Sequence, residues 1–125
     1  MRILILDDEE YRHEAFNKAH AADECWHAYT LRQFMDQIER VKKFDVIYLD
    51  HDITDSKATT GLDAVRFLVR TLQACPDKMP DKVVVHSWNP IGSVIMTEEL
   101  RAAGVSTYKR TFHIKDGVYD FEGGL

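Results

Sequence analysis

Short runs of apolar and β-forming residues, separated by segments with helical spacing, constrain the fold of this chain more than any other feature. The clearest runs are continuously apolar, which is typical of strands covered on both faces of a sheet. The expected strands are residues 2–6, 25–30, 44–49, 82–86 and 105–109. Their alternation with helices predicts one α/β domain, residues 1–125, with a parallel sheet and right-handed crossovers.

Helix ends can be located from capping residues. Thr30 with Gln33, and Thr60 with Asp63, form capping-box patterns at the starts of two helices. The pair Asn89-Pro90 begins a third helix that runs to about residue 103, where Gly104 fits a C-terminal cap. A first helix is expected over residues 9–20, on which the histidines are expected to be solvated.

Polar residues with metal- or phosphate-binding chemistry follow the predicted strands. In doubly wound sheets, ligands bind beyond the carboxyl ends of the strands, so residues from separate strands can share one site. The candidates are Asp7, Asp8, Asp50, His51, Asp52, His86, Ser87, Asn89 and Lys109.

Three carboxylates, from Asp7, Asp8 and Asp50, are expected to meet at this edge. Like charges in one place raise at least one pKa unless a cation is present. Mg²⁺ takes hard oxygen ligands and leaves positions open for water or phosphate, so it is the expected cofactor. The alternative is that some of these aspartates only cap helices, with Asp8 as the N-cap of the first helix.

Ser87 and Lys109 complement the acids, because a hydroxyl and an ammonium can hold phosphate oxygens. Asn89 is a further candidate phosphate ligand, although its position as the N-cap before Pro90 is the favoured explanation.

The order Asp7-Asp8, Asp50, Ser87, Lys109 resembles the receiver domain of two-component response regulators over about residues 1–109. The resemblance implies a flavodoxin/CheY-like sheet of order 2-1-3-4-5. It also implies that Asp50 accepts a phosphoryl group, and that the acidic pair and the backbone carbonyl of Asp52 bind Mg²⁺.

The chain departs from that family in three places. The segment 52–61 is longer than the usual loop and is a candidate lid. Arg110 follows Lys109 where receivers have a proline. The tail after residue 110 shows no fifth helix, and Asp116-Gly117 predicts a hairpin or an irregular segment instead.

The stretches "LDHDI" and "HSWNP" add His51 and His86 to the receiver pattern. In this the chain resembles a receiver-derived family named for the processing of cyclic phosphates and associated with RNA-end repair. Histidines near neutral pKa can transfer protons during phosphoester cleavage. Because neighbouring strand residues point to opposite faces, each histidine could instead point toward a covering helix and have a structural role.

Three functions follow from these patterns. The first is a Mg²⁺-dependent phosphoesterase that opens 2′,3′-cyclic phosphates of nucleotides or RNA ends, with Asp50, His51 and His86 as catalytic residues. The second is a stand-alone receiver phosphorylated on Asp50. The third is a degenerate receiver used only for protein binding, against which the intact acidic set counts.

Composition limits the partners. The net charge of −5 argues against an extended nucleic-acid groove, but a small phosphate-containing substrate or a single RNA end remains compatible. No apolar stretch approaches the roughly 20 residues that span a bilayer, and no signal peptide is visible. We therefore expect a cytoplasmic protein with no membrane contact; the oligomeric state cannot be predicted.

Overall fold

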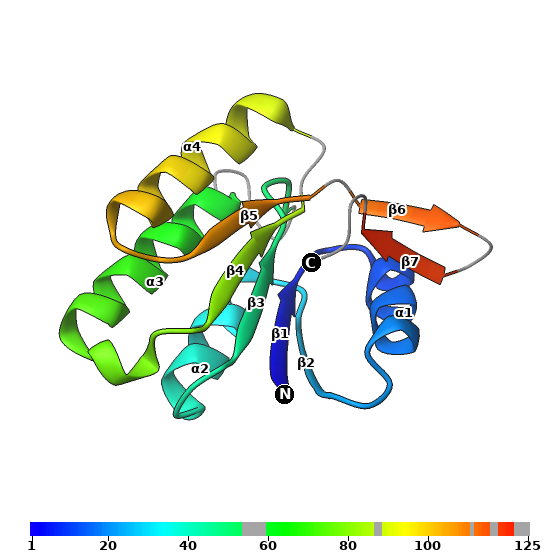
Figure 1. The fold of residues 1–125 in the computed structure, drawn as a ribbon, viewed down its shortest axis with the longest axis horizontal. Coiled ribbons are helices and arrows are strands. Elements are labelled where there is room, and N and C mark those ends of the chain that lie inside the picture. The colour runs from blue at the N-terminus through cyan, green and yellow to red at the C-terminus, as the bar shows by residue number, and fades with distance from the viewer. Residues whose placement is uncertain (54–59, 87–88, 111, 116–117, 122–125) are drawn as a thin grey trace.

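The computed structural model describes residues 1–53, 60–86, 89–110, 112–115 and 118–121. Its main sheet has five parallel strands in the order β2-β1-β3-β4-β5, which confirms the predicted fold (Figure 1). The strands are β1 (Arg2–Leu6), β2 (Glu24–Ala28), β3 (Val46–Leu49), β4 (Lys82–Val85) and β5 (Thr107–Lys109). The helices are α1 (Glu10–Ala19), α2 (Leu31–Arg40), α3 (Gly61–Ala74), the short 3₁₀ turn η1 (Pro76–Lys78) and α4 (Pro90–Ala102).

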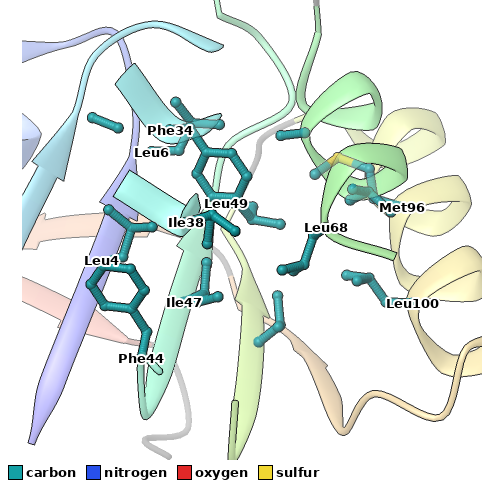
Figure 2. Close-up of a cluster of buried hydrophobic side chains, with 14 of the residues drawn as sticks. Leu4, Leu6, Phe34, Ile38, Phe44, Ile47, Leu49, Leu68, Met96 and Leu100 are labelled. Carbon is teal, nitrogen blue, oxygen red and sulfur yellow. The ribbon is translucent and has the colours of Figure 1, made fainter. Parts of the chain in front are cut away.

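Helices cover both faces of the sheet, as the continuously apolar strands predict. Alternate strand residues form two cores, one against α2, α3 and α4, the other against α1. Figure 2 shows the larger core, in which Leu4, Leu6, Ile47 and Leu49 from the sheet meet helix residues such as Phe34. The smaller core holds Ile3, Ile5, Val46, Tyr48 and Val84 beneath Ala15 and Phe16.

The helix starts follow the predicted capping chemistry. Thr60 accepts a hydrogen bond from the Leu62 amide and forms a capping box with Asp63. Thr30 Oγ1 accepts from the Gln33 amide at 3.1 Å, and Asn89 Oδ1 accepts from the Gly92 amide at 2.8 Å.

The end of α4 also fixes the start of the last strand of the sheet. Gly104 has a φ of +82°, the left-handed conformation that glycine adopts easily after a helix. The Val105 amide then donates to the Leu100 carbonyl at 3.0 Å, which ties this residue to the helix end. Strand β5 therefore begins at Thr107, two residues later than the sequence predicts.

The tail forms the predicted hairpin, with strands β6 (Phe112–Lys115) and β7 (Val118–Phe121) paired antiparallel. Its expected turn residues, Asp116 and Gly117, lie outside the described residues. Strand β7 contacts α1, so the hairpin stands beside the helix that covers the smaller core (Figure 1). Among the residues that the structure describes, none of the helices has the length and apolar character needed to cross a bilayer.

Candidate functional site

The candidate site is formed by the residues that directly follow strands β1, β3 and β4, and these residues continue the hydrogen bonding of the sheet. The Asp50 amide donates to the Leu6 carbonyl at 3.1 Å, and the His86 amide donates to the Leu49 carbonyl at 3.0 Å. Asp7, Asp50 and His86 are each two residues beyond a member of the smaller core, so alternation places them on the face covered by α1. The site therefore lies next to the smaller core, at the carboxyl edge of the sheet.

Three carboxylates converge at this edge, as the sequence predicts. Oxygen atoms of Asp7, Asp8 and Asp50 all lie within 4.8 Å of one another. Asp7 and Asp50 are buried and Asp8 is half-buried. Asp8 does not cap α1, because Glu9 occupies that position without a side-chain cap bond. A divalent cation fits this set, since Mg²⁺ and Ca²⁺ bind carboxylate oxygens.

Asp7 is held in its ionised form by its surroundings. His86 Nε2 donates to Asp7 Oδ2 at 2.9 Å, and the Glu9 amide donates to Asp7 Oδ1 at 2.9 Å. Burial acts to raise the pKa of Asp7, but the His86 hydrogen bond, with the further help of Glu9 and Arg12, holds it below its usual value. His86 is fully buried, so its ring orients Asp7 from inside the protein.

Arg12 is the site residue that sequence reasoning missed. Its Nη1 lies 3.1 Å from Asp7 Oδ2 and 3.2 Å from Asp50 Oδ2, so one guanidinium joins carboxylates from two strands. The guanidinium offsets part of the negative charge of the two buried acids. The sequence could have indicated Arg12 only through helical spacing. Arg12 precedes the buried Ala15 by three residues and so lies on the same face of α1.

Asp50 has a different environment from Asp7. Burial raises the pKa of Asp50 to about 6, and the negative charge of Asp7 adds to the rise. The charges of His86 and Arg12 act in the opposite direction without cancelling it. The pKa values of the two buried aspartates are therefore shifted in opposite directions, that of Asp7 downward and that of Asp50 upward.

His13 also belongs to this region, and the expectation that it is solvated is wrong. Its side chain is buried, and His13 Nε2 donates to the Asp7 backbone carbonyl at 2.8 Å. The reason is again spacing on α1, since His13 lies three residues before the buried Phe16 and shares its face.

His51 points to the opposite face from Asp50. A Cβ added to Gly92 would lie 2.3 Å from His51 Cδ2, so the ring rests directly on the first turn of α4. His51 Nδ1 lies 2.8 Å from Asp52 Oδ1, which forms a histidine–carboxylate pair that is partly open to solvent. In the described part of the chain, no hydrogen bond joins His51 to the three clustered aspartates.

The remaining candidate residues from the sequence do not all gather around the three clustered aspartates in the described part of the structure. Asn89 caps α4 through its oxygen, and its Nδ2 lies 3.4 Å from His51 Nδ1. Asp52 has an exposed carboxylate outside the acidic cluster. Lys109 is exposed at the end of β5, and no ion pair among the described residues joins it to the clustered aspartates. Ser87 and most of the predicted lid, residues 54–59, lie outside the described residues.

The fold and the acidic edge define a receiver-like protein. Among solved structures, the chain is similar to a Burkholderia pseudomallei response regulator with a phosphorylated aspartic acid, calcium ion and citrate (TM-score 0.64, 15% identity, 86% of this chain and 58% of that chain). It is also similar to the response regulator domain of Thermotoga maritima CheB (TM-score 0.61, 19% identity, 86% and 75%). A receiver protein from Pseudomonas putida matches at a TM-score of 0.60, 18% identity, and 86% and 84% coverage.

These identities establish the fold alone, and the chain spans 58% of the length of the Burkholderia protein. The sequence match is more specific. Residues 2–102 match the model of the cyclic-phosphate processing receiver domain, so the chain belongs to that family. No curated protein matches the chain.

Proposed function

We propose that this protein is a metal-dependent enzyme that opens cyclic phosphates, with 2′,3′-cyclic nucleotides or RNA ends as its substrates. The observation that carries the proposal is the convergence of Asp7, Asp8 and Asp50 within 4.8 Å at the ligand-binding edge of the sheet. Membership of the cyclic-phosphate processing receiver family supports the same reaction class.

Mg²⁺ is the cofactor that we propose for the acidic cluster. When bound to these carboxylates, it would polarise phosphoryl oxygens and favour the ionised form of water. Asp7 is prepared for this role, because His86 and the Glu9 amide hold its carboxylate in one orientation. We assign His86 this positioning role in place of the proton transfer expected from the sequence, since its ring is fully buried.

His51 is the side chain better suited to proton transfer. Asp52 accepts a hydrogen bond from His51 Nδ1, which leaves the Nε2 lone pair available as a base. In the proposed reaction, a water oxygen bonds to phosphorus while the bond from phosphorus to one ribose oxygen breaks. The water gives one proton to His51 Nε2, and the released ribose oxygen takes one proton from the imidazolium. The products balance as a phosphomonoester and a free hydroxyl.

Cationic and polar groups at the strand ends would hold the substrate. Arg12 presents a planar guanidinium between Asp7 and Asp50, a shape that matches phosphate oxygens in two-point hydrogen bonds. Lys109 is exposed at the end of β5 and adds a second positive charge. For Ser87 and Asn89, phosphate binding stays a prediction, as does a cytoplasmic location.

A second function has its own support. The structure of the similar Burkholderia protein contains a phosphorylated aspartic acid and a calcium ion. Asp50 follows β3 at the carboxyl edge of the same kind of sheet, and its carboxylate lies among the other acids. As a phospho-acceptor, Asp50 would bond through one oxygen to the phosphorus of a donor while the bond to the donor's leaving group breaks.

One pair of assays separates the two functions. The protein is incubated with Mg²⁺ and uridine 2′,3′-cyclic monophosphate, and the monophosphate products are separated by chromatography. In parallel it is incubated with Mg²⁺ and acetyl phosphate, and intact mass is measured. Asp50→Asn, His51→Gln and wild type are compared in both assays, with circular dichroism as the folding control.

We expect turnover of the cyclic nucleotide that falls at least about a hundredfold in Asp50→Asn and in His51→Gln. A stable phospho-adduct that Asp50→Asn abolishes, without cyclic phosphate turnover, would establish the acceptor function instead. If the protein shows no turnover and forms no phospho-adduct, both the enzymatic and the acceptor functions are rejected, and the protein-binding function remains.

A further inference from the structure

Two histidine rings face each other on the side of the molecule formed by α1 and β2. His13 lies on α1 and is buried, and His27 lies on the edge strand β2 and is half-buried. Their Nδ1 atoms are 2.7 Å apart. The proposed reaction uses neither Nδ1 atom.

The outer nitrogen of each ring has an oxygen partner. His13 Nε2 lies 2.8 Å from the Asp7 carbonyl oxygen, which can only accept, so this nitrogen carries a proton. His27 Nε2 lies 2.8 Å from Asn17 Oδ1, and an amide oxygen also only accepts. Both neutral rings are therefore in the Nε2–H form, with a bare lone pair on each Nδ1.

Two lone pairs at 2.7 Å repel each other, so either a proton or a metal ion must lie between the two nitrogens. A histidine that donates its outer N–H to a backbone or side-chain oxygen while its inner nitrogen is bare is in the arrangement found in metal-binding histidines. Tyr29 stacks on His13 with ring centroids 3.9 Å apart, which holds that ring in its orientation.

We propose that His13 Nδ1 and His27 Nδ1 form a binding site for a transition-metal ion that prefers imidazole, with Zn²⁺ as the leading example. This site is separate from the acidic cluster, which offers only oxygen ligands.

The geometry requires a small adjustment. Zinc–nitrogen bonds of about 2.0–2.1 Å at a tetrahedral angle place two nitrogens about 3.3 Å apart, so the rings must separate by roughly half an ångström. His27 can make this movement, because it lies on the edge strand and its outer partner, Asn17, is exposed on α1. His13 stays fixed by the Asp7 carbonyl.

The test is a Zn²⁺ titration by calorimetry with Mg²⁺ in excess, followed by nitrogen-15 spectra of the histidine rings. Wild type is compared with His27→Gln, which removes one ligand at a half-buried position. His20→Gln is the matched control, since His20 is also partly buried at the end of α1 but bonds to Asp23. Asp50→Asn tests whether the acidic cluster contributes.

We expect one Zn²⁺ per chain in wild type, in His20→Gln and in Asp50→Asn, with at least tenfold weaker binding in His27→Gln. The Nδ1 signals of His13 and His27 should move on Zn²⁺ addition while both Nε2 protons remain. Equal binding by His27→Gln would overturn the proposal. Spectra that remain unchanged on Zn²⁺ addition and show a proton on His27 Nδ1 would also overturn it. In that case the Asn17 amide donates to His27 Nε2, and the two neutral histidines form an ordinary hydrogen bond that needs no metal.

Discussion

His86 Nε2 donates a hydrogen bond to Asp7 Oδ2 at 2.9 Å, and neither side chain is exposed to solvent. Strand β3 separates the two strands that carry them, so this bond ties the acidic cluster together across the width of the site. The same hydrogen bond is expected to affect both the stability of the fold and the binding of a metal ion by Asp7.

Removing His86 leaves the Asp7 carboxylate buried with one partner fewer. We expect His86→Ala to lower the free energy of unfolding by about 2–4 kcal/mol without metal, as measured by urea denaturation. The double variant Asp7→Asn/His86→Ala completes a double-mutant cycle. A coupling energy above about 1 kcal/mol is expected, and strictly additive effects would show that the bond contributes nothing.

Asp50 should make the metal-free protein less stable as pH rises. Burial raises its pKa to about 6 from 3.8, so the folded state holds the proton more tightly than the unfolded state. The contribution is fully present below about pH 4 and is lost as pH rises through about 6, a change of roughly 3 kcal/mol at most. Urea denaturation of wild type and Asp50→Asn from about pH 4 to 7 measures the difference. Parallel curves would contradict this origin of the shift.

Arg12 supplies the positive charge between Asp7 and Asp50 without a metal. Replacing it by glutamine leaves a more negative cluster, so we expect Arg12→Gln to bind Mg²⁺ roughly threefold to tenfold more tightly. The metal-free variant should be less stable than wild type. Calorimetry and thermal unfolding with and without Mg²⁺ test both parts. Weaker Mg²⁺ binding would mean that Arg12 orders the acids for the ion rather than competing with it.

Gly92 makes room for the His51 ring. An alanine Cβ there would lie 2.3 Å from His51 Cδ2, so Gly92→Ala must displace the ring. We expect cyclic phosphate turnover to fall at least about tenfold, while stability changes by no more than about 1–2 kcal/mol. Gly104→Ala is the control, since its Cβ meets nothing within 4 Å but its φ of +82° disfavours alanine. It should lose stability and keep turnover; the reverse result would reject the role of His51.

The strands, the helix starts and the hairpin could be predicted because each depends on local chemistry. The continuous apolar runs required a sheet covered on both faces, and Thr60 and Asn89 mark helix starts by satisfying amides within one turn. The meeting of Asp7 and Asp50 followed from topology, since both residues follow adjacent parallel strands.

The side chains that α1 contributes to the site could not be predicted from local sequence patterns in the same way. Which face of a short helix turns inward depends on how it docks, and the apolar residues of this helix do not form a clean stripe. The apolar Tyr11 is exposed, whereas the polar Arg12 and His13 face inward. Spacing from Ala15 and Phe16 indicates the inward face only once those residues are known to be buried. The partners of Arg12 and His13, Asp50 and the Asp7 carbonyl among them, come from other elements of the fold, and no local pattern identifies them.

Asp50 and His51 are joined by one peptide bond and serve opposite sides of the sheet. The division depends on the length of β3 alone, because the direction of each side chain is set by counting from Leu49. Deleting a single residue upstream would put the imidazole in the place of the Asp50 side chain and the Asp50 carboxylate in the place of Leu49, inside the larger core. The number of residues in β3 is therefore as strict a requirement of this site as the identity of the two side chains.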